Sequence, residues 1–310
     1  MLPPGAGRRP RCHGKGGRVR DSHSGIGSDS EGDWELSEAY ESSSGEVRWE
    51  RLGDPAAPPV VLLHGTPFSS YVWRRAAREL ARDHRVYVWD MPGYGTSAKF
   101  DGQDVSLAAQ GRVFAELLAH WDLAEPSVVA HDFGGAVALR AHLLHGAAYR
   151  RLALVDPVAL APWGSPFFRL VGEHHRVFEQ LPPHLHRALV REYIASASSP
   201  GLDPAVLDRL VEPWLGEAGQ PAFYRQIAQA DQAYTDEIQG RYGSVEPPLT
   251  VCWGEDDQWI PVAKAHELVS LVPGAELVLV PGAGHLVQED APGALGAALA
   301  RFLGAAGTGR

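Results

Sequence analysis

The residues VVAHDFGGAV, at positions 128–137, put a carboxylate at the end of an apolar run and two glycines shortly after it. The run has the length and composition of a buried strand, and the residues behind it begin a helical pattern that ends at Gly146. A buried strand end is an unfavourable place for a charge unless the charge has a use. The stretch therefore predicts a strand-to-helix turn with Asp132 at its tip, and it makes Asp132 the first candidate functional residue.

Five further apolar runs have the same character. They are rich in Val and Leu and apolar at consecutive positions, as is typical of strands buried on both faces of a parallel sheet. These runs occupy residues 59–65, 85–90, 151–156, 249–254 and 276–282. Amphipathic helical patterns lie between the runs, at 73–83, 107–121 and 265–272. This alternation predicts an α/β fold with a mostly parallel sheet flanked by helices.

Two segments interrupt the alternation. Residues 161–245 contain helix-like pieces separated by Pro and Gly, and we interpret them as a helical lid inserted between two parts of the core, residues 46–160 and 246–304. Residues 1–45 are rich in Gly, Ser and charged residues, a composition that cannot bury enough apolar surface to fold. We therefore expect residues 1–45 to form a disordered extension.

The composition excludes several classes of function. The 310 residues carry 28 basic and 38 acidic side chains, a net charge of −10, and no basic stripe with interleaved aromatic residues, so we expect no nucleic-acid partner. No apolar run approaches the ~20 residues that span a bilayer, so we expect no membrane association. The two cysteines, Cys12 and Cys252, suit neither a disulfide framework nor a metal site, which fits a cytoplasmic protein that binds no metal.

The residues around Asp132 match the requirements of a nucleophile elbow. Such a turn needs small residues two positions before and two after the reactive residue, and Ala130 and Gly134 meet this requirement. The positive end of the following helix would favour an ionised carboxylate. The alternative interpretation is that Asp132 only caps that helix.

Three further stretches at strand ends supply partners for Asp132. In HGTPFSSYVWR, at 64–74, the backbone N–H of Thr66 can join the N–H of Phe133 in a two-donor oxyanion hole. GEDDQWIP, at 254–261, offers Asp257, and VPGAGHLVQED, at 280–290, offers His285. The chain order is nucleophile, acid, histidine, which is the order of α/β-hydrolases.

From about residue 47 to residue 304 the chain resembles the α/β-hydrolase superfamily. AHDFGG together with HGTPFSSYVWR looks like the aspartate-nucleophile branch of that superfamily, the epoxide hydrolases and haloalkane dehalogenases. DMPGYGTS, at 90–97, is similar to a loop that those proteins carry after the preceding strand. The resemblance implies an α/β-hydrolase fold, a helical lid and a hydrolase that needs no cofactor.

An aspartate nucleophile points to attack on an alkyl carbon. A carboxylate is ionised at neutral pH and needs no base, and with an sp³ carbon it forms an ordinary ester. We expect Asp132 to form this alkyl-enzyme ester. His285, oriented by Asp257, would then activate the water that hydrolyses it.

The resemblance leaves the leaving group open between epoxide oxygen and halide. Haloalkane dehalogenases typically hold halide with a Trp directly after the nucleophile and a second Trp or an Asn. Here Phe133 follows Asp132 and has no donor, and the chain contains no Asn. We therefore expect an epoxide hydrolase that acts on a small, neutral, hydrophobic substrate, with haloalkane dehalogenase as the alternative. A lactone or ester hydrolase and a non-catalytic ligand receptor on the same fold stay as further alternatives, and the oligomeric state stays open.

The remaining candidate residues also come from the resemblance. Epoxide hydrolases donate a proton from lid tyrosines, one of them in a Tyr-Arg pair, and AFYRQI at 222–227 makes Tyr224 the candidate for that one. The other tyrosine of the family comes earlier in the lid, and Tyr193 is a loose candidate for it. Some haloalkane dehalogenases keep their acid after the next strand, which makes Asp156 the alternative to Asp257. The residues expected to line the substrate pocket are Trp163, Phe167 and Trp259.

Overall fold

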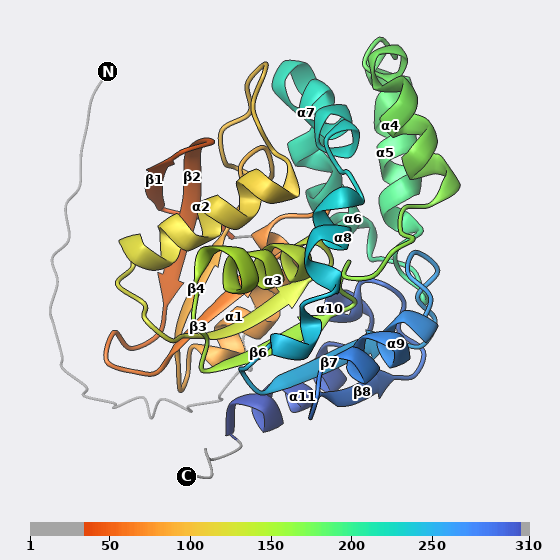
Figure 1. Cartoon of the computed structure of the whole chain (residues 1–310). Coiled ribbons are helices and arrows are strands. Elements are labelled where there is room, and N and C mark those ends of the chain that lie inside the picture. Colours follow the sequence, from red (N-terminus) through yellow and green to blue (C-terminus); the bar gives the residue numbers. More distant parts are fainter. Residues whose placement is uncertain (1–33, 305–310) are drawn as a thin grey trace, which may run out of the picture. The chain divides into compact units, whose positions relative to one another are not determined.

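The computed structural model describes residues 34–304, and its core is one mixed sheet (Figure 1). The strands are β1 (Glu38–Ser42), β2 (Gly45–Leu52), β3 (Pro59–Leu63), β4 (Arg85–Trp89), β5 (Ser127–His131), β6 (Arg151–Val155), β7 (Leu249–Gly254) and β8 (Glu276–Val280). Their order is β1-β2-β4-β3-β5-β6-β7-β8. The pairs β1–β2 and β2–β4 are antiparallel, and all others are parallel. The predicted α/β fold with a mostly parallel sheet is therefore confirmed.

The helices lie on both faces of the sheet and beyond its carboxyl edge (Figure 1). They are α1 (Arg74–Leu80), α2 (Leu107–His120), α3 (Phe133–His145), α4 (Pro166–Phe178), α5 (Pro183–Ala195), α6 (Pro204–Val211), α7 (Gly216–Ala228), α8 (Ala233–Gln239), α9 (Ala263–Leu271), α10 (Val287–Asp290) and α11 (Pro292–Gly304). Short 3₁₀ helices are η1 (Ser70–Trp73), η2 (Glu212–Trp214) and η3 (Tyr242–Ser244). None of the helices in the described residues is both long and apolar enough to cross a membrane.

The central strands are buried from end to end, which explains why the apolar runs identified them. Every residue of β5 is buried, and Val128 and Val129 have no exposed surface. Burying such a side chain contributes about 1.5–3 kcal/mol. Because six parallel strands end at the same edge, the loops that follow them converge there, and these loops carry the candidate functional residues.

The amino-terminal boundary of the fold differs from our prediction. Residues 1–33 lie outside the described residues, but the predicted disordered extension is too long, because β1 and the start of β2 fall inside it. These strands form an antiparallel hairpin turned by Gly45, whose φ of 102° is a conformation that favours glycine. The hairpin is stabilised by pairing with β4 rather than by an apolar core of its own. Its sequence is therefore polar and lacks the apolar run by which the other strands were predicted.

The segment between β6 and β7 contains helices α4 to α8 and no strand. Two of its helices differ from the patterns in the sequence. Helix α4 was not predicted, although Ser165 caps its start and Pro166 occupies its first position, a common start signal. Helix α7 begins at Gly216 and contains Pro221 in its interior, where a proline usually ends or kinks a helix.

Candidate active site

Asp132 sits in the tight turn between β5 and α3. Its φ of 50° and ψ of −119° lie outside the regions that non-glycine residues usually adopt, and such strain is concentrated at functional sites. The neighbours that permit this turn are glycines. A Cβ on Gly65 would lie 2.3 Å from the Asp132 Cβ, and one on Gly134 would lie 2.6 Å from the His64 carbonyl oxygen. The elbow therefore requires glycine at both positions.

The two carboxylate oxygens of Asp132 face different partners. The backbone N–H of Thr66 donates to Oδ1 over 2.6 Å, and Nε2 of His285 lies 3.4 Å from Oδ2. Phe133 begins α3, and N–H groups in the first turn of a helix have no acceptor within the helix. One oxygen thus accepts the Thr66 N–H, while the other faces the imidazole.

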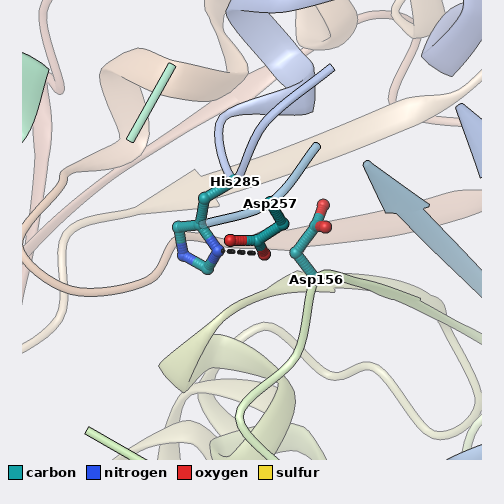
Figure 2. Close-up of side chains that lie close together, drawn as sticks. All are labelled: Asp156, Asp257 and His285. Atoms are coloured by element: carbon teal, nitrogen blue, oxygen red, sulfur yellow. Dashed lines mark hydrogen bonds and ion pairs between the residues drawn. The ribbon is translucent and has the colours of Figure 1, made fainter. Parts of the chain in front are cut away.

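His285 and Asp257 form a buried hydrogen-bonded pair. Nδ1 of His285 lies 2.8 Å from Oδ2 of Asp257, and Figure 2 shows this contact as a dashed line. The other carboxylate oxygen accepts the backbone N–H groups of Trp259 and Ile260 at 2.7 and 2.9 Å. Because ionised Asp257 can only accept, Nδ1 of His285 carries the proton and Nε2 is directed at Asp132.

The charges around His285 decide its protonation. Burial acts to lower the pKa of His285, but the negative charges of Asp257 and Asp132 raise it well above its usual value. His131 packs against the same ring, and burial together with His285 lowers the pKa of His131 to about 3. Neutral His131 donates from Nε2 to the carbonyl oxygen of His285 over 2.9 Å, so it holds the loop without adding a charge.

Asp156 ends β6 beside this pair, on the side of Asp257 away from His285 (Figure 2). One polar atom from each of Asp156, Asp257 and His285 lies within 4.8 Å of the others, a spacing that a metal ion could use. The histidine proton that points at Asp257 favours a hydrogen-bonded acid–base array instead. The Oδ1 atom of Asp156 accepts the N–H of Gly254 at 2.9 Å, whereas Asp257 is the carboxylate hydrogen-bonded to His285. Asp257 therefore takes the position next to the histidine.

A narrow cavity of about 40 Å³ lies above Asp132. Its walls are mostly aromatic, and the lining side chains are Thr66, Phe133, Val158, Trp163, Ser165, Phe168, Tyr193, Trp259 and Ile260. The two indole N–H groups are already engaged: Trp163 donates to the Thr235 hydroxyl at 2.8 Å, and Trp259 donates to the Ser196 hydroxyl at 3.0 Å. The cavity thus combines apolar walls with few available donors.

Two predicted residues lie elsewhere. The Tyr224 hydroxyl is 2.8 Å from Nδ1 of His186, and Tyr224 is not among the cavity-lining residues. Phe167 also misses the cavity and packs against Tyr193, while its neighbour Phe168 lines the wall, because adjacent helical residues point about 100° apart. Tyr193 lines the cavity and stacks on Trp259 with ring centroids 4.6 Å apart.

Comparisons with known proteins agree with this geometry. The family model described as alpha/beta hydrolase fold matches residues 58–292. The crystal structure of an alpha/beta hydrolase fold protein from Burkholderia ambifaria is 48% identical, with a TM-score of 0.83, and covers 86% of this chain and 97% of that one. Epoxide hydrolase A of Mycobacterium tuberculosis is 28% identical over 309 residues, covering 83% of this chain and 94% of the relative.

A second relative, with a different activity in its name, is slightly more similar in sequence. The dihydrolipoyllysine-residue acetyltransferase component of the acetoin cleaving system of Pseudomonas putida is 30% identical over 249 residues. The match covers 79% of this chain but only 63% of that relative's length. The fold is therefore shared with proteins whose names give different activities, and the activity of this chain has to be argued from its own site.

Proposed function

The chain belongs to the α/β-hydrolase fold family, and we propose that it is an epoxide hydrolase in which Asp132 is the nucleophile. The observation that carries the proposal is the pair of contacts at Asp132: Thr66 N–H on one carboxylate oxygen and His285 on the other. A serine at this position would need the histidine as a base before attack, whereas a carboxylate needs no activation. The relative named epoxide hydrolase A supports the same assignment.

The first step is attack of Asp132 Oδ2 on a ring carbon of the epoxide. The carbon–oxygen bond of the ring breaks, and the ring oxygen takes a proton. We assign that proton to the Tyr193 hydroxyl, since Tyr193 lines the cavity over Asp132. Burial, and then the charge of Asp132, raise the pKa of Tyr193, so its hydroxyl stays protonated and able to donate.

The second step is hydrolysis of the ester. Neutral His285, held by Asp257, takes a proton from water, and the hydroxide adds to the Asp132 carbonyl carbon. The oxygen that becomes negative is the one that Thr66 N–H already contacts, and such a donor contributes roughly 3 kcal/mol. The ester bond then breaks, the leaving alkoxide takes the proton held by His285, and the diol is released. The new carboxyl group of Asp132 gives up its proton, which replaces the one that Tyr193 donated in the first step.

The hydrogen bonds of the two cavity tryptophans favour an epoxide substrate over a haloalkane. A halide site requires N–H donors that point into the cavity, but those of Trp163 and Trp259 are directed at Thr235 and Ser196. A protonated phenol suits an alkoxide, which needs a proton to leave, better than a halide, which does not. We also propose that residues 161–245 act as the lid, because α4 and α5 carry Phe168 and Tyr193 over the nucleophile.

A panel of epoxides, alkyl bromides and activated esters tests the substrate class, with diol, bromide and phenol as the measured products. We expect diol, whereas bromide without diol would replace the proposal with the haloalkane reaction. A single turnover in H₂¹⁸O tests the nucleophile separately, because label should enter the Asp132 side chain. An unlabelled Asp132 peptide would exclude Asp132 as the ester-forming group, and ligand binding without turnover would favour a receptor.

Two tyrosine variants test the proton donor. We expect Tyr193→Phe to slow ester formation from epoxides by roughly 100-fold or more, the usual contribution of general acid catalysis. Tyr224→Phe is the matched control, because its hydroxyl contacts His186 rather than the cavity. Pre-steady-state measurement of the ester gives both rates, and a larger loss in Tyr224→Phe would move the role back to Tyr224.

A further inference from the structure

Asp156 has features that the proposed mechanism does not use. Its carboxyl group has no exposed surface, and Oδ2 has no hydrogen-bond partner although it is buried. Its backbone adopts a φ of 42°, one of three positive values among the described non-glycine residues. A strained, buried carboxyl group with an unpartnered oxygen is expensive to keep unless it has a role.

The carboxyl group of Asp156 lies beside that of Asp257. A carboxylate oxygen of each residue lies within 4.8 Å of the other, and both side chains are buried. Two ionised carboxylates at this separation in a dry site repel strongly, and such pairs usually share one proton. Each oxygen of Asp257 already accepts N–H groups, but a carboxylate oxygen can accept more than one hydrogen bond.

We propose that Asp156 is a protonated positioning residue, which donates from Oδ2 to the carboxylate of Asp257 and gives the pair one negative charge. The hydrogen of Asp156 fills the one gap in the hydrogen bonding of the pair, while Gly254 N–H holds the other oxygen. The proton keeps Asp257 ionised and correctly oriented toward Nδ1 of His285.

The titratable surroundings of Asp156 agree with this assignment. Burial, and then the negative charge of Asp257, raise the pKa of Asp156 well above its usual value, whereas His285 and the Gly254 N–H act to lower it. The thiol of Cys252 on β7 is the other titratable group nearby, and burial raises its pKa to about 12, so it stays neutral. In this proposal, Asp156 is protonated, Asp257 is ionised, and together they orient His285.

The arrangement also gives the site a reserve acid. If Asp257 loses its charge by substitution with Asn, Asp156 no longer faces a neighbouring anion and can ionise near His285. Asp156 would then supply part of the missing negative charge. This second consequence rests on the proposed hydrolase function, whereas the protonation of Asp156 does not.

Infrared spectroscopy of the full chain at neutral pH tests the proton directly, without substrate. We expect the carbonyl band of a protonated carboxyl group in the wild type and in Asp132→Asn, and its loss in Asp156→Asn. A band that survives in Asp156→Asn, or no band in the wild type, would overturn the proposal. If Asp156→Asn fails to fold, ¹³C NMR of aspartate-labelled wild type decides, since it should show one protonated aspartate at neutral pH, and none would overturn the proposal.

A double-mutant cycle tests the reserve role by turnover. Asp156→Asn should lower turnover about threefold in the wild type, because its amide still donates to Asp257 but no longer shares a proton with it, and about tenfold or more in Asp257→Asn. Equal losses in both backgrounds would show a merely structural Asp156 and exclude the reserve role. Should the wild type hydrolyse no epoxide while the infrared result holds, the proposed function fails and the shared proton stands.

Discussion

The charges of Asp132 and His285 control each other during the proposed reaction. In the free enzyme, the Asp132 carboxylate is one of the groups that raise the pKa of His285. Ester formation removes that negative charge, so the pKa of His285 falls just before the histidine is needed as a base. Formation of the ester at Asp132 therefore makes His285 available as a base in its neutral form.

This coupling predicts two different acid dependences. As the pH falls, His285 becomes protonated and hydrolysis stops, whereas attack needs only the carboxylate of Asp132, so ester should accumulate at low pH. The apparent pKa of ester hydrolysis should lie below the pKa of His285 in the free enzyme, because the ester lacks the Asp132 charge. Mass spectrometry of the trapped ester and NMR titration of the histidine measure the two values.

Asp132→Asn serves as the control for this prediction, since its neutral amide resembles the ester in charge. The NMR pKa of His285 should fall in this variant. An unchanged value would mean that Asp132 does not raise the pKa of His285, and a failure of ester formation at low pH would contradict the two-step scheme.

Helix α7 and the preceding η2 contact the loop that carries Thr66. Gln226 accepts the hydroxyl protons of Thr66 and Tyr94 at 2.6 and 3.1 Å, and Trp214 donates to the Pro67 carbonyl oxygen at 2.6 Å. The residue whose N–H contacts Asp132 is thus fixed by a side chain of the inserted segment. Movement of α7 would shift the donor as well as the cavity wall.

Gln226→Leu should therefore reduce turnover as well as stability. The substitution leaves two buried hydroxyl groups without their acceptor, which costs about 1–3 kcal/mol of unfolding free energy, and it loosens the loop that carries Thr66. We expect roughly a tenfold lower kcat with little change in KM, because the donor acts most strongly in the transition state.

Gln229→Leu is the matched control on the same helix end, because Gln229 bonds to Val105 and Gln103 of the core and not to Thr66. It should lower the urea midpoint while kcat stays near the wild-type value. A similar loss of kcat in both variants would show that general loosening of α7, rather than the Thr66 contact, governs turnover.

The elements differ in how far the sequence predicts them, for physical reasons. The strands β3 to β8 were predictable because burial on both faces makes them apolar at consecutive positions, and the elbow was predictable because its turn demands small residues. Tyr193 and Tyr224 could not be ranked in this way. Both lie on amphipathic helices, and which helix faces the cavity depends on the packing of α5 and α7 and not on local pattern.

Strand β2 was not predictable for a different reason. It mixes polar and apolar residues at the antiparallel end of the sheet, and its partner β4 is remote in sequence.

At the scale of the whole molecule, a buried ion pair joins distant parts of the chain next to the site. Arg74, at the start of α1, forms a bidentate contact with Glu289 of α10, and one of the two bonds measures 3.0 Å. The Arg74 side chain is fully buried and lies over the Tyr71 ring. Since α10 directly follows the loop of His285, the pair anchors that loop to the opposite part of the core.

Glu289→Ala should lower the free energy of unfolding by about 3–5 kcal/mol, because it leaves a buried arginine charge without its main partner. Asp104→Ala removes the partner of Arg112 in an exposed pair and should cost at most about 1 kcal/mol. Urea denaturation of both variants measures the difference. Equal losses would contradict the view that this pair anchors the fold.

The bond between Trp163 and Thr235 has a consequence for how this scaffold could change chemistry. The indole ring already faces Phe133 at the cavity wall, and its N–H is turned toward a hydroxyl on α8 that does not line the cavity. Thr235→Ala would release that N–H without altering any group that meets the substrate. A change of leaving group from epoxide oxygen to halide could thus begin with a substitution at a residue outside the cavity. The first substitutions that separate the two reactions would then affect residues that orient the cavity wall, and only later ones would affect catalytic residues.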